Sequence, residues 1–169
     1  GETKVLPLAE ARACGHRFDW AKEPPFHPNS PGVRVLNDVP LADIFAHMDW
    51  SPFFHSWGLR GVYPKIFESE KYGVEARKLH AEAEKLLERI IAEKRFHPRA
   101  VYGIWPANRV GDNVEIFSDE QRATSTGIFH FLRQQTEKDN DRPYQCLADF
   151  IAPKDTGVGD WVGGFVCTA

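Results

Sequence analysis

The chain has little cysteine, and its cysteines are far apart. Cys14, Cys146 and Cys167 are the only three, and their spacing offers neither a C-x-x-C motif nor a paired disulfide framework. We therefore expect reduced thiols in a reducing compartment. Cys146 and Cys167 each lie in an apolar, strand-like run, where a free cysteine behaves as a small hydrophobic residue.

The chain also lacks a basic surplus and a long apolar run. Its formal net charge is -3 and its pI about 6.2, whereas proteins that bind a nucleic-acid backbone are usually basic. No apolar run approaches the ~18 to 20 residues that cross a bilayer, and the N-terminal stretch has no signal-peptide core. These features argue against nucleic acid and membrane as partners and predict a cytoplasmic protein.

The length and composition favour one folded domain. The chain has 169 residues, of which 42% are hydrophobic and 27% charged, close to the globular average. Residues 1–31 contain one short helical pattern, at 8–14, followed by a run with four prolines between Pro24 and Pro31. Proline fixes φ and removes a backbone donor, so residues 1–31 are predicted to form an extended arm leading in from something upstream.

The remaining residues alternate between strand and helix patterns. A strand is predicted at 32–36, and a short helix at 41–48, capped by Asn37 or Asp38. A long amphipathic helix is predicted at 74–94, where apolar residues recur every three or four positions. The later predicted elements are strands 100–105 and 113–117, a helix at 124–138, and strands 144–152 and 161–168.

The two strands at 100–105 and 113–117 are predicted to form a hairpin. Pro106 is expected to end the first strand, and Gly111 to take a positive φ in the turn. A hairpin with long helices inserted around it indicates an α+β fold with a largely antiparallel sheet. A strand that runs to the last residues would leave an exposed edge, so we expect the domain to be incomplete in this chain.

Asp49 is the first candidate site residue, because it lies within the aromatic run MDWSPFFHSWGLRGVYPKIF. A carboxylate in such surroundings must be hydrated, paired or bound to a cationic ligand. The alternative is that Asp49 accepts hydrogen bonds from nearby backbone amides at a helix end or turn. The neighbouring aromatic residues would form either the core or the wall of a ligand pocket; they are Trp50, Phe53, Phe54 and Trp57.

Two other kinds of site were weighed. His47, Asp49 and His55 form the tightest cluster of potential metal ligands, although no H-E-x-x-H motif is present. Ser51 and Ser56 lie nearby, but without the G-x-S-x-G elbow of a serine hydrolase. The glycine-rich run TGVGDWVGG precedes a strand and not a helix, which favours a turn over a dinucleotide-binding loop.

Several long motifs resemble the activation domain of cobalamin-dependent methionine synthase. They are MDWSPFFHSWGLRGVYPKIF, GVEARKL, YGIWPANRVGDNVEIF, LRQQTEK and CLADFIAPKDTGVGDWVGGFVCTA. The resemblance covers nearly the whole chain and is weakest over the first ~35 residues.

This resemblance implies a C-shaped domain with a twisted antiparallel sheet, which binds S-adenosylmethionine and docks on the cobalamin-binding domain. It also implies a role in reductive methylation of cob(II)alamin, with flavodoxin or a flavoprotein reductase supplying the electron. The module would then belong to a methyltransferase without being catalytic alone, and residues 1–31 would link it to the upstream cobalamin module.

Asp49 matches the family aspartate that holds the amino group of S-adenosylmethionine. The family's other main contacts lie in an R-x-x-x-G-Y segment, yet no Gly-Tyr pair occurs in this chain. Residues 32–169 are therefore expected to be the N-terminal part of the domain, with weak or absent affinity for S-adenosylmethionine by themselves. The alternatives left open are a metal-dependent hydrolase that uses His47, Asp49 and His55, and a purely structural interaction module.

Overall fold

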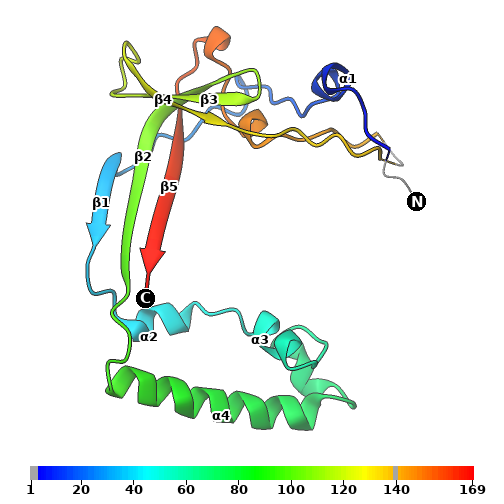
Figure 1. Cartoon of the computed structure of the whole chain (residues 1–169), viewed down its shortest axis with the longest axis vertical. Helices are drawn as coiled ribbons and strands as arrows, with labels where there is room; N and C mark the ends of the chain where they lie inside the picture. Colours follow the sequence, from blue (N-terminus) through cyan, green and yellow to red (C-terminus); the bar gives the residue numbers. More distant parts are fainter. Residues whose placement is uncertain (1–3, 139–140) are drawn as a thin grey trace. The chain divides into compact units, whose positions relative to one another are not determined.

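The computed structural model describes residues 4–138 and 141–169 (Figure 1). The helices and strands along the chain are α1 (Leu8–Ala13), β1 (Gly32–Leu36), α2 (Leu41–Ala46), α3 (Trp50–Ser56), α4 (Gly73–Ala92), β2 (Arg99–Val110), β3 (Asn113–Phe117), β4 (Ser125–His130) and β5 (Asp160–Thr168). Short 3-10 turns occur at η1 (Lys65–Glu68), η2 (Leu147–Phe150) and η3 (Lys154–Thr156).

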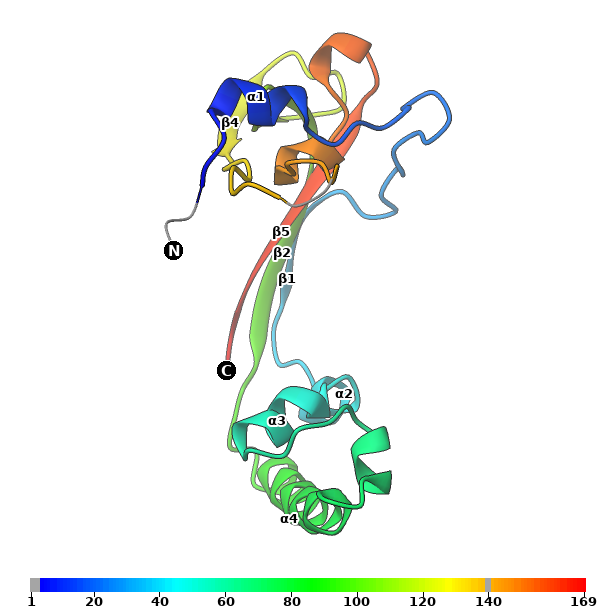
Figure 2. The same ribbon diagram turned by 90° about the vertical axis from the view of Figure 1, so that its right-hand side faces the viewer.

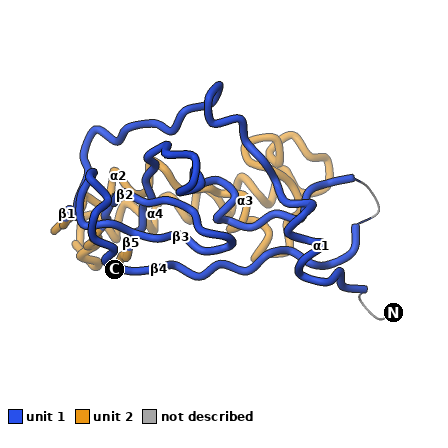
Figure 3. Tube along the Cα trace, turned by 90° about the horizontal axis from the view of Figure 1, so that it is seen from above, with its two compact units in different colours: residues 1–34, 102–165 blue, residues 35–101, 166–169 orange. Residues whose placement is uncertain are grey.

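The chain divides into two compact units (Figure 3). Unit 1 comprises Gly1–Arg34 and Tyr102–Phe165, and unit 2 comprises Val35–Val101 and Val166–Ala169. Strands β1, β2 and β5 each contain residues of both units.

The strands form one five-stranded sheet in the order β1-β2-β3-β4, with β5 also paired to β2. β1 and β5 both pair with β2, and Figure 2 shows these three strands together. The pairs β2–β3 and β3–β4 are antiparallel. The predicted α+β fold with a largely antiparallel sheet is therefore confirmed.

The β2–β3 hairpin forms where it was predicted, but its first strand, β2, extends beyond the predicted end. Val110 pairs with Asn113, and Gly111 takes φ +63° in the turn between them. Pro106, however, lies within β2 instead of ending it. Pairing with β3 begins at Ala107, so the missing N–H of Pro106 removes no bond from that ladder.

Two predicted elements after β3 are wrong. Residues predicted as a helix at 124–138 contain β4, which pairs with β3 through contacts such as Val114 opposite Phe129. Pairing with the preceding strand, β3, has overridden the helical spacing. Residues 144–152, predicted as a strand, instead contain η2, because Asp149 Oδ2 accepts the backbone N–H of Cys146 and closes a tight turn.

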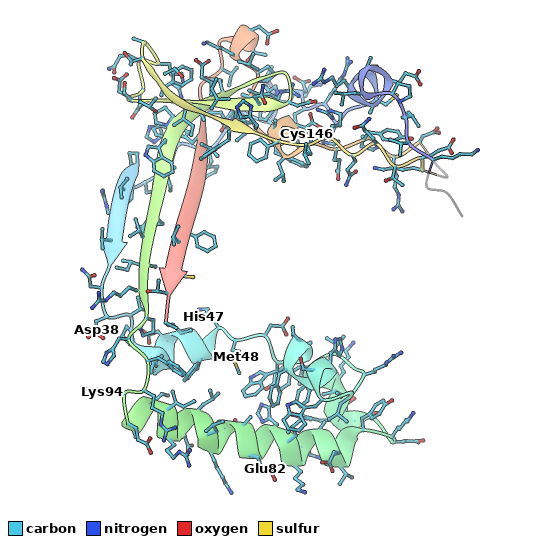
Figure 4. The ribbon with its side chains drawn as sticks, viewed as in Figure 1. Asp38, His47, Met48, Glu82, Lys94 and Cys146 are labelled. Carbon is cyan, nitrogen blue, oxygen red and sulfur yellow. The ribbon has the colours of Figure 1, made fainter. Side chains whose placement is uncertain are left out.

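The short helix α2 also departs from prediction. It ends at Ala46 and begins after Pro40, with no hydrogen bond from a capping side chain. Asp38 is one of three non-glycine residues with positive φ among the described residues, at +59°. Asp38 and Lys94 are labelled in Figure 4, near the start of α2 and the end of α4 respectively.

Each unit has its own core. In unit 1, Ala107, Val114, Cys146 and Ala148 are buried together, and burial raises the pKa of the Cys146 thiol. Cys146 thus behaves as the predicted small hydrophobic residue, whereas Cys167 and Cys14 are exposed; all three are free thiols.

The core of unit 2 lies between the aromatic run and α4. Phe54, Ile66 and Ala76 are its buried residues, and α4 matches the helix predicted at 74–94 to within two residues. The predicted charged face of α4 is exposed; Glu82, labelled in Figure 4, is one example.

The N-terminal segment packs within unit 1. Ala11 is fully buried, the N–H of Leu6 donates to the carbonyl of Gln135, and the N–H of Tyr144 donates to the carbonyl of Cys14. Residues 15–31 contain no helix or strand. The role of residues 1–31 as a linker to an upstream module stays a prediction.

Candidate functional site

Asp49 is the N-cap residue of α3. Its backbone is extended (φ -81°, ψ 116°), and its Oδ1 accepts the backbone N–H of Ser51 at 2.9 Å. The residue is exposed, and it begins one helix instead of closing the preceding one. The carboxylate is therefore open to solvent. The hydrogen bond to a backbone amide, weighed as the alternative, is present.

The two histidines beside Asp49 have backbone partners. Nδ1 of His47 lies 2.8 Å from the carbonyl oxygen of Asp43, and Nε2 of His55 lies 3.0 Å from that of Gly61. Within residues 4–138 and 141–169, no group of three or more His, Cys, Asp or Glu side chains is arranged to hold a metal ion. The structure does not bring His47, Asp49 and His55 together as a ligand set.

The serines of the run serve local structure. Oγ of Ser51 accepts the backbone N–H of Tyr63 at 3.2 Å, and Oγ of Ser56 donates to the carbonyl of Pro52 at 2.9 Å. Neither contact pairs a hydroxyl with a general base. No observation therefore favours the hydrolase alternative.

The aromatic residues of the run differ in exposure. Phe54 is fully buried and belongs to the core, whereas Trp57 is 64% exposed. Trp50 and Phe53 are partly buried and pack against the core cluster. Of the aromatic residues predicted near a ligand, Phe54 is thus a core residue, and Trp57 presents the most open ring.

His80 of α4 lies inside this aromatic cluster. Its ring centroid is 4.3 Å from that of Trp50 and 5.5 Å from that of Tyr63, with which it is stacked at 14°. Its Nδ1 lies 3.1 Å from a carboxylate oxygen of Glu84. Its buried Nε2 has no hydrogen-bond partner among the described residues.

Unit 1 contains a buried charge network that sequence reasoning missed. Arg133 donates to both oxygens of Asp149, to Oδ1 of Asp112 and to the carbonyl of Tyr144. The side chains of Arg133 and Asp149 are only 3% and 1% exposed. Arg133 lies within the motif LRQQTEK, but its carboxylate partners are 16 and 21 positions away, so no local spacing could reveal them.

Two further arginines complete the network. Nε of Arg12 lies 2.8 Å from Oδ2 of Asp112, and Nη1 of Arg109 lies 3.0 Å from Oδ1 of Asp149. Gly15 permits this packing, because a Cβ on Gly15 would lie 2.7 Å from Nη1 of Arg133. The network therefore joins α1, the β2–β3 turn, β2, η2 and the segment after β4.

The network shifts the pKa values of its carboxyl groups. Burial alone would raise the pKa of Asp149, but the hydrogen bonds from Arg133 and from the N–H of Cys146 outweigh burial and hold it below its ordinary value. The pKa of Asp112 is lowered in the same way, since Arg133 and Arg12 together outweigh its burial. The hydrogen bonds that Arg133 donates to Asp149 and Asp112 outweigh its burial and raise its pKa.

The glycine-rich segment forms a turn, as predicted. Gly157 takes φ +72° directly after η3, and β5 follows at Asp160. The side chain of Asn108 donates to the carbonyls of Ala152 and Val158 and thereby fixes the segment against β2.

These observations define a mixed α/β domain with an antiparallel sheet and a separate helical unit that displays an exposed carboxylate beside aromatic rings. A comparison with known families then assigns the domain to one of them. The sequence model of the family described as "Vitamin B12 dependent methionine synthase, activation domain" matches residues 40–169. The chain belongs to this family.

A solved structure supports this assignment. The chain is 42% identical to the protein in a crystal structure described as the MetH reactivation domain bound to AdoHcy, with a TM-score of 0.85. The match covers 98% of this chain and 50% of that one, so the chain spans half the length of its solved relative. Among the described residues, no helix has the length and apolar character needed to cross a membrane.

Proposed function

We propose that this chain forms part of the S-adenosylmethionine-binding reactivation module of a cobalamin-dependent methionine synthase. Membership of the activation-domain family supports the proposal, as does likeness to a domain described with AdoHcy bound. The observation that carries it is the exposed carboxylate of Asp49 at the start of α3.

Asp49 has the chemistry to accept an ammonium group. Its Oδ1 accepts one backbone N–H, while Oδ2 has no partner within the described part of the chain. S-adenosylmethionine carries an α-ammonium group, and a charge-assisted hydrogen bond to it contributes ~1.5 to 3 kcal/mol. The exposed ring of Trp57, at the other end of α3, offers apolar surface within the same unit.

In this function the chain binds and positions S-adenosylmethionine, which would supply the methyl group for the reactivation of cob(II)alamin, while a reductase would supply the one electron that the change of oxidation state requires. We propose the cobalamin-binding domain of the same enzyme and a flavodoxin or flavoprotein reductase as partners, in the cytoplasm. Because the chain spans half of its solved relative, we propose that the rest of the module supplies further contacts to the ligand.

The test replaces Asp49 by Asn in the full-length enzyme that carries this sequence. Asparagine caps a helix as well as aspartate does, so Asp49→Asn removes the charge and keeps α3 intact. We expect S-adenosylmethionine to bind roughly tenfold more weakly, or worse, by calorimetry. Asp43→Asn is the matched control, because Asp43 is an exposed acid of α2.

Unchanged affinity of Asp49→Asn, with the parent binding measurably, would show that Asp49 is only a helix cap. A second measurement uses the 169-residue chain alone. If it lacks part of the site, equilibrium dialysis should find a dissociation constant weaker than ~10 μM. Tighter binding would show that this chain already holds the main ligand contacts.

A further inference from the structure

The arginines of unit 1 have more hydrogen-bond donors than the network uses. Arg133 directs its Nε and both terminal nitrogens at Asp112, Asp149 and a carbonyl. A guanidinium group has five N–H donors, and all those of Arg133 are accounted for by these contacts. Arg133 is therefore a structural ion.

Arg12 and Arg109 differ from Arg133. Among the described residues, Arg12 uses only its Nε, toward Asp112, and Arg109 uses only its Nη1, toward Asp149. Most of their N–H donors remain unused. The two carboxylates have room for few of these donors, because three of their four oxygens already accept two bonds each and Oδ2 of Asp112 accepts one.

A pocket of about 380 Å³ has Arg12, Arg17, Arg109 and Arg133 in its wall. Arg17 is exposed and has no polar contact with any described residue. The four arginines carry four positive charges, and Asp149 and Asp112 carry two negative charges. The site therefore has two uncompensated positive charges. A second pocket, of about 540 Å³, shares Arg12, Arg109 and Arg133.

The same pocket has an aromatic side. His16, Phe18 and Trp20 contribute to its wall. These rings are packed together, with centroids 4.5 Å apart for His16 and Phe18 and 5.1 Å apart for Phe18 and Trp20. Phe150 backs them and stacks on His16 at 17°. Packed rings of this kind present a firm surface on which a flat ligand can lie.

We propose that this pocket binds a small molecule that carries a phosphate monoester on a flat ring. Arginine forks bind phosphate oxygens in pairs, and a phosphate dianion matches the two uncompensated charges of the site. A monocarboxylate carries half that charge and has two acceptor oxygens, so it would leave a positive charge unmatched. The site lies within unit 1, whereas Asp49 belongs to unit 2.

Calorimetry on the full-length enzyme tests the proposal with three probes: phenyl phosphate, inorganic phosphate and benzoate. We expect phenyl phosphate to bind most tightly, since it alone combines the dianion with a ring. Arg12→Gln and Arg109→Gln should each weaken phenyl phosphate about tenfold. Arg34→Gln is the control, because Arg34 is exposed on β1 and, among the described residues, its side chain bonds only to the carbonyl of Val33.

Arg17→Gln is the variant that still tests the proposal if the other two unfold, because Arg17 has no polar partner among the described residues. We expect it to weaken the binding of phenyl phosphate severalfold. Affinity for S-adenosylmethionine should stay unchanged in all three variants, which separates this site from the one proposed around Asp49. Absence of saturable binding of phenyl phosphate would overturn the proposal. So would equal binding of benzoate, or an equal loss of affinity in Arg34→Gln.

Discussion

Arg133 and Asp149 form a two-armed ion pair in the interior of unit 1. Nη2 of Arg133 lies 2.6 Å from Oδ1 of Asp149, and Nη1 lies 2.8 Å from Oδ2. Oδ2 of Asp149 also accepts the backbone N–H of Cys146. The pair therefore fixes both the segment after β4 and the turn η2, neither of which has a strand ladder along its length.

Replacing Arg133 by Met should destabilise the protein strongly. It would leave Asp149 buried with the partly exposed Arg109 as its only cationic partner, and breaking a buried pair typically costs ~3 to 5 kcal/mol. Urea denaturation monitored by circular dichroism gives the free energy of unfolding. Arg34→Gln is the control and should change it by less than ~0.5 kcal/mol. A loss below ~1 kcal/mol for Arg133→Met would show that the pair is dispensable.

The network also predicts how stability depends on pH. The folded-state pKa values of Asp112 and Asp149 are lowered from the ordinary 3.8. Their contribution to stability is therefore fully present above that value and is lost as the pH falls through the lower folded-state values. The free energy of unfolding, measured from neutral pH downward, should decline most steeply below about pH 4.

Asp112→Asn provides the comparison for the acid limb. It removes one of the two titrating carboxyl groups, so its stability should fall less steeply with decreasing pH than that of the parent. An identical slope in the two proteins would mean that other carboxyl groups cause the acid loss. One such group is Glu115, whose pKa is lowered by a hydrogen bond from Lys154.

Gly73, the first residue of α4, should not tolerate alanine. Alanine favours a helix over glycine by ~1 kcal/mol. A Cβ at Gly73, however, would lie 2.5 Å from the carbonyl oxygen of Phe67, a backbone atom that cannot swing away, and such overpacking costs ~1 to 3 kcal/mol. We expect Gly73→Ala to lower the thermal midpoint. Gly127→Ala, where a Cβ meets nothing within 4 Å, should leave it nearly unchanged.

His80→Phe should maintain or raise stability, although His80 lies among aromatic rings. The substitution removes a buried nitrogen that lacks a partner among the described residues, and such a group costs ~1 to 3 kcal/mol. Glu84 would lose its contact with Nδ1 of His80, but its carboxylate is mostly exposed and stays hydrated. Phe54→Ala in the same cluster should instead cost ~3 to 5 kcal/mol. Strong destabilisation by His80→Phe would indicate that Nε2 binds a group the ring cannot replace.

The sequence predicted the elements whose pattern is local. Helix α4 shows its apolar spacing over 20 residues, and Gly111 marks the hairpin turn directly. The strand β4 was predicted as a helix because Ile128 and Phe131 are also compatible with helical spacing, and only pairing with β3 decides between the two structures. That pairing joins β4 to another strand, so the spacing of residues within β4 alone does not show it.

The candidate sites also differ in whether their sequence signal is local. Asp49 could be selected from its aromatic surroundings, and capping by Asp49 was one of the two interpretations weighed. The Arg133 network could not be predicted, because Arg12 and Asp112 are 100 positions apart and Arg133 and Asp149 are 16 apart. Such charges are recognisable only once the chain has folded.

The three strands that each carry residues of both units have a consequence for protein engineering. Neither unit is encoded by one continuous stretch of gene: the first is interrupted by residues 35–101, and the second takes its last four residues, Val166–Ala169, from the end of β5 and the residue that follows it. A truncation that keeps one unit must therefore cut β1, β2 and β5 in mid-strand. Isolating either half would call for a redesigned linker, not a simple deletion.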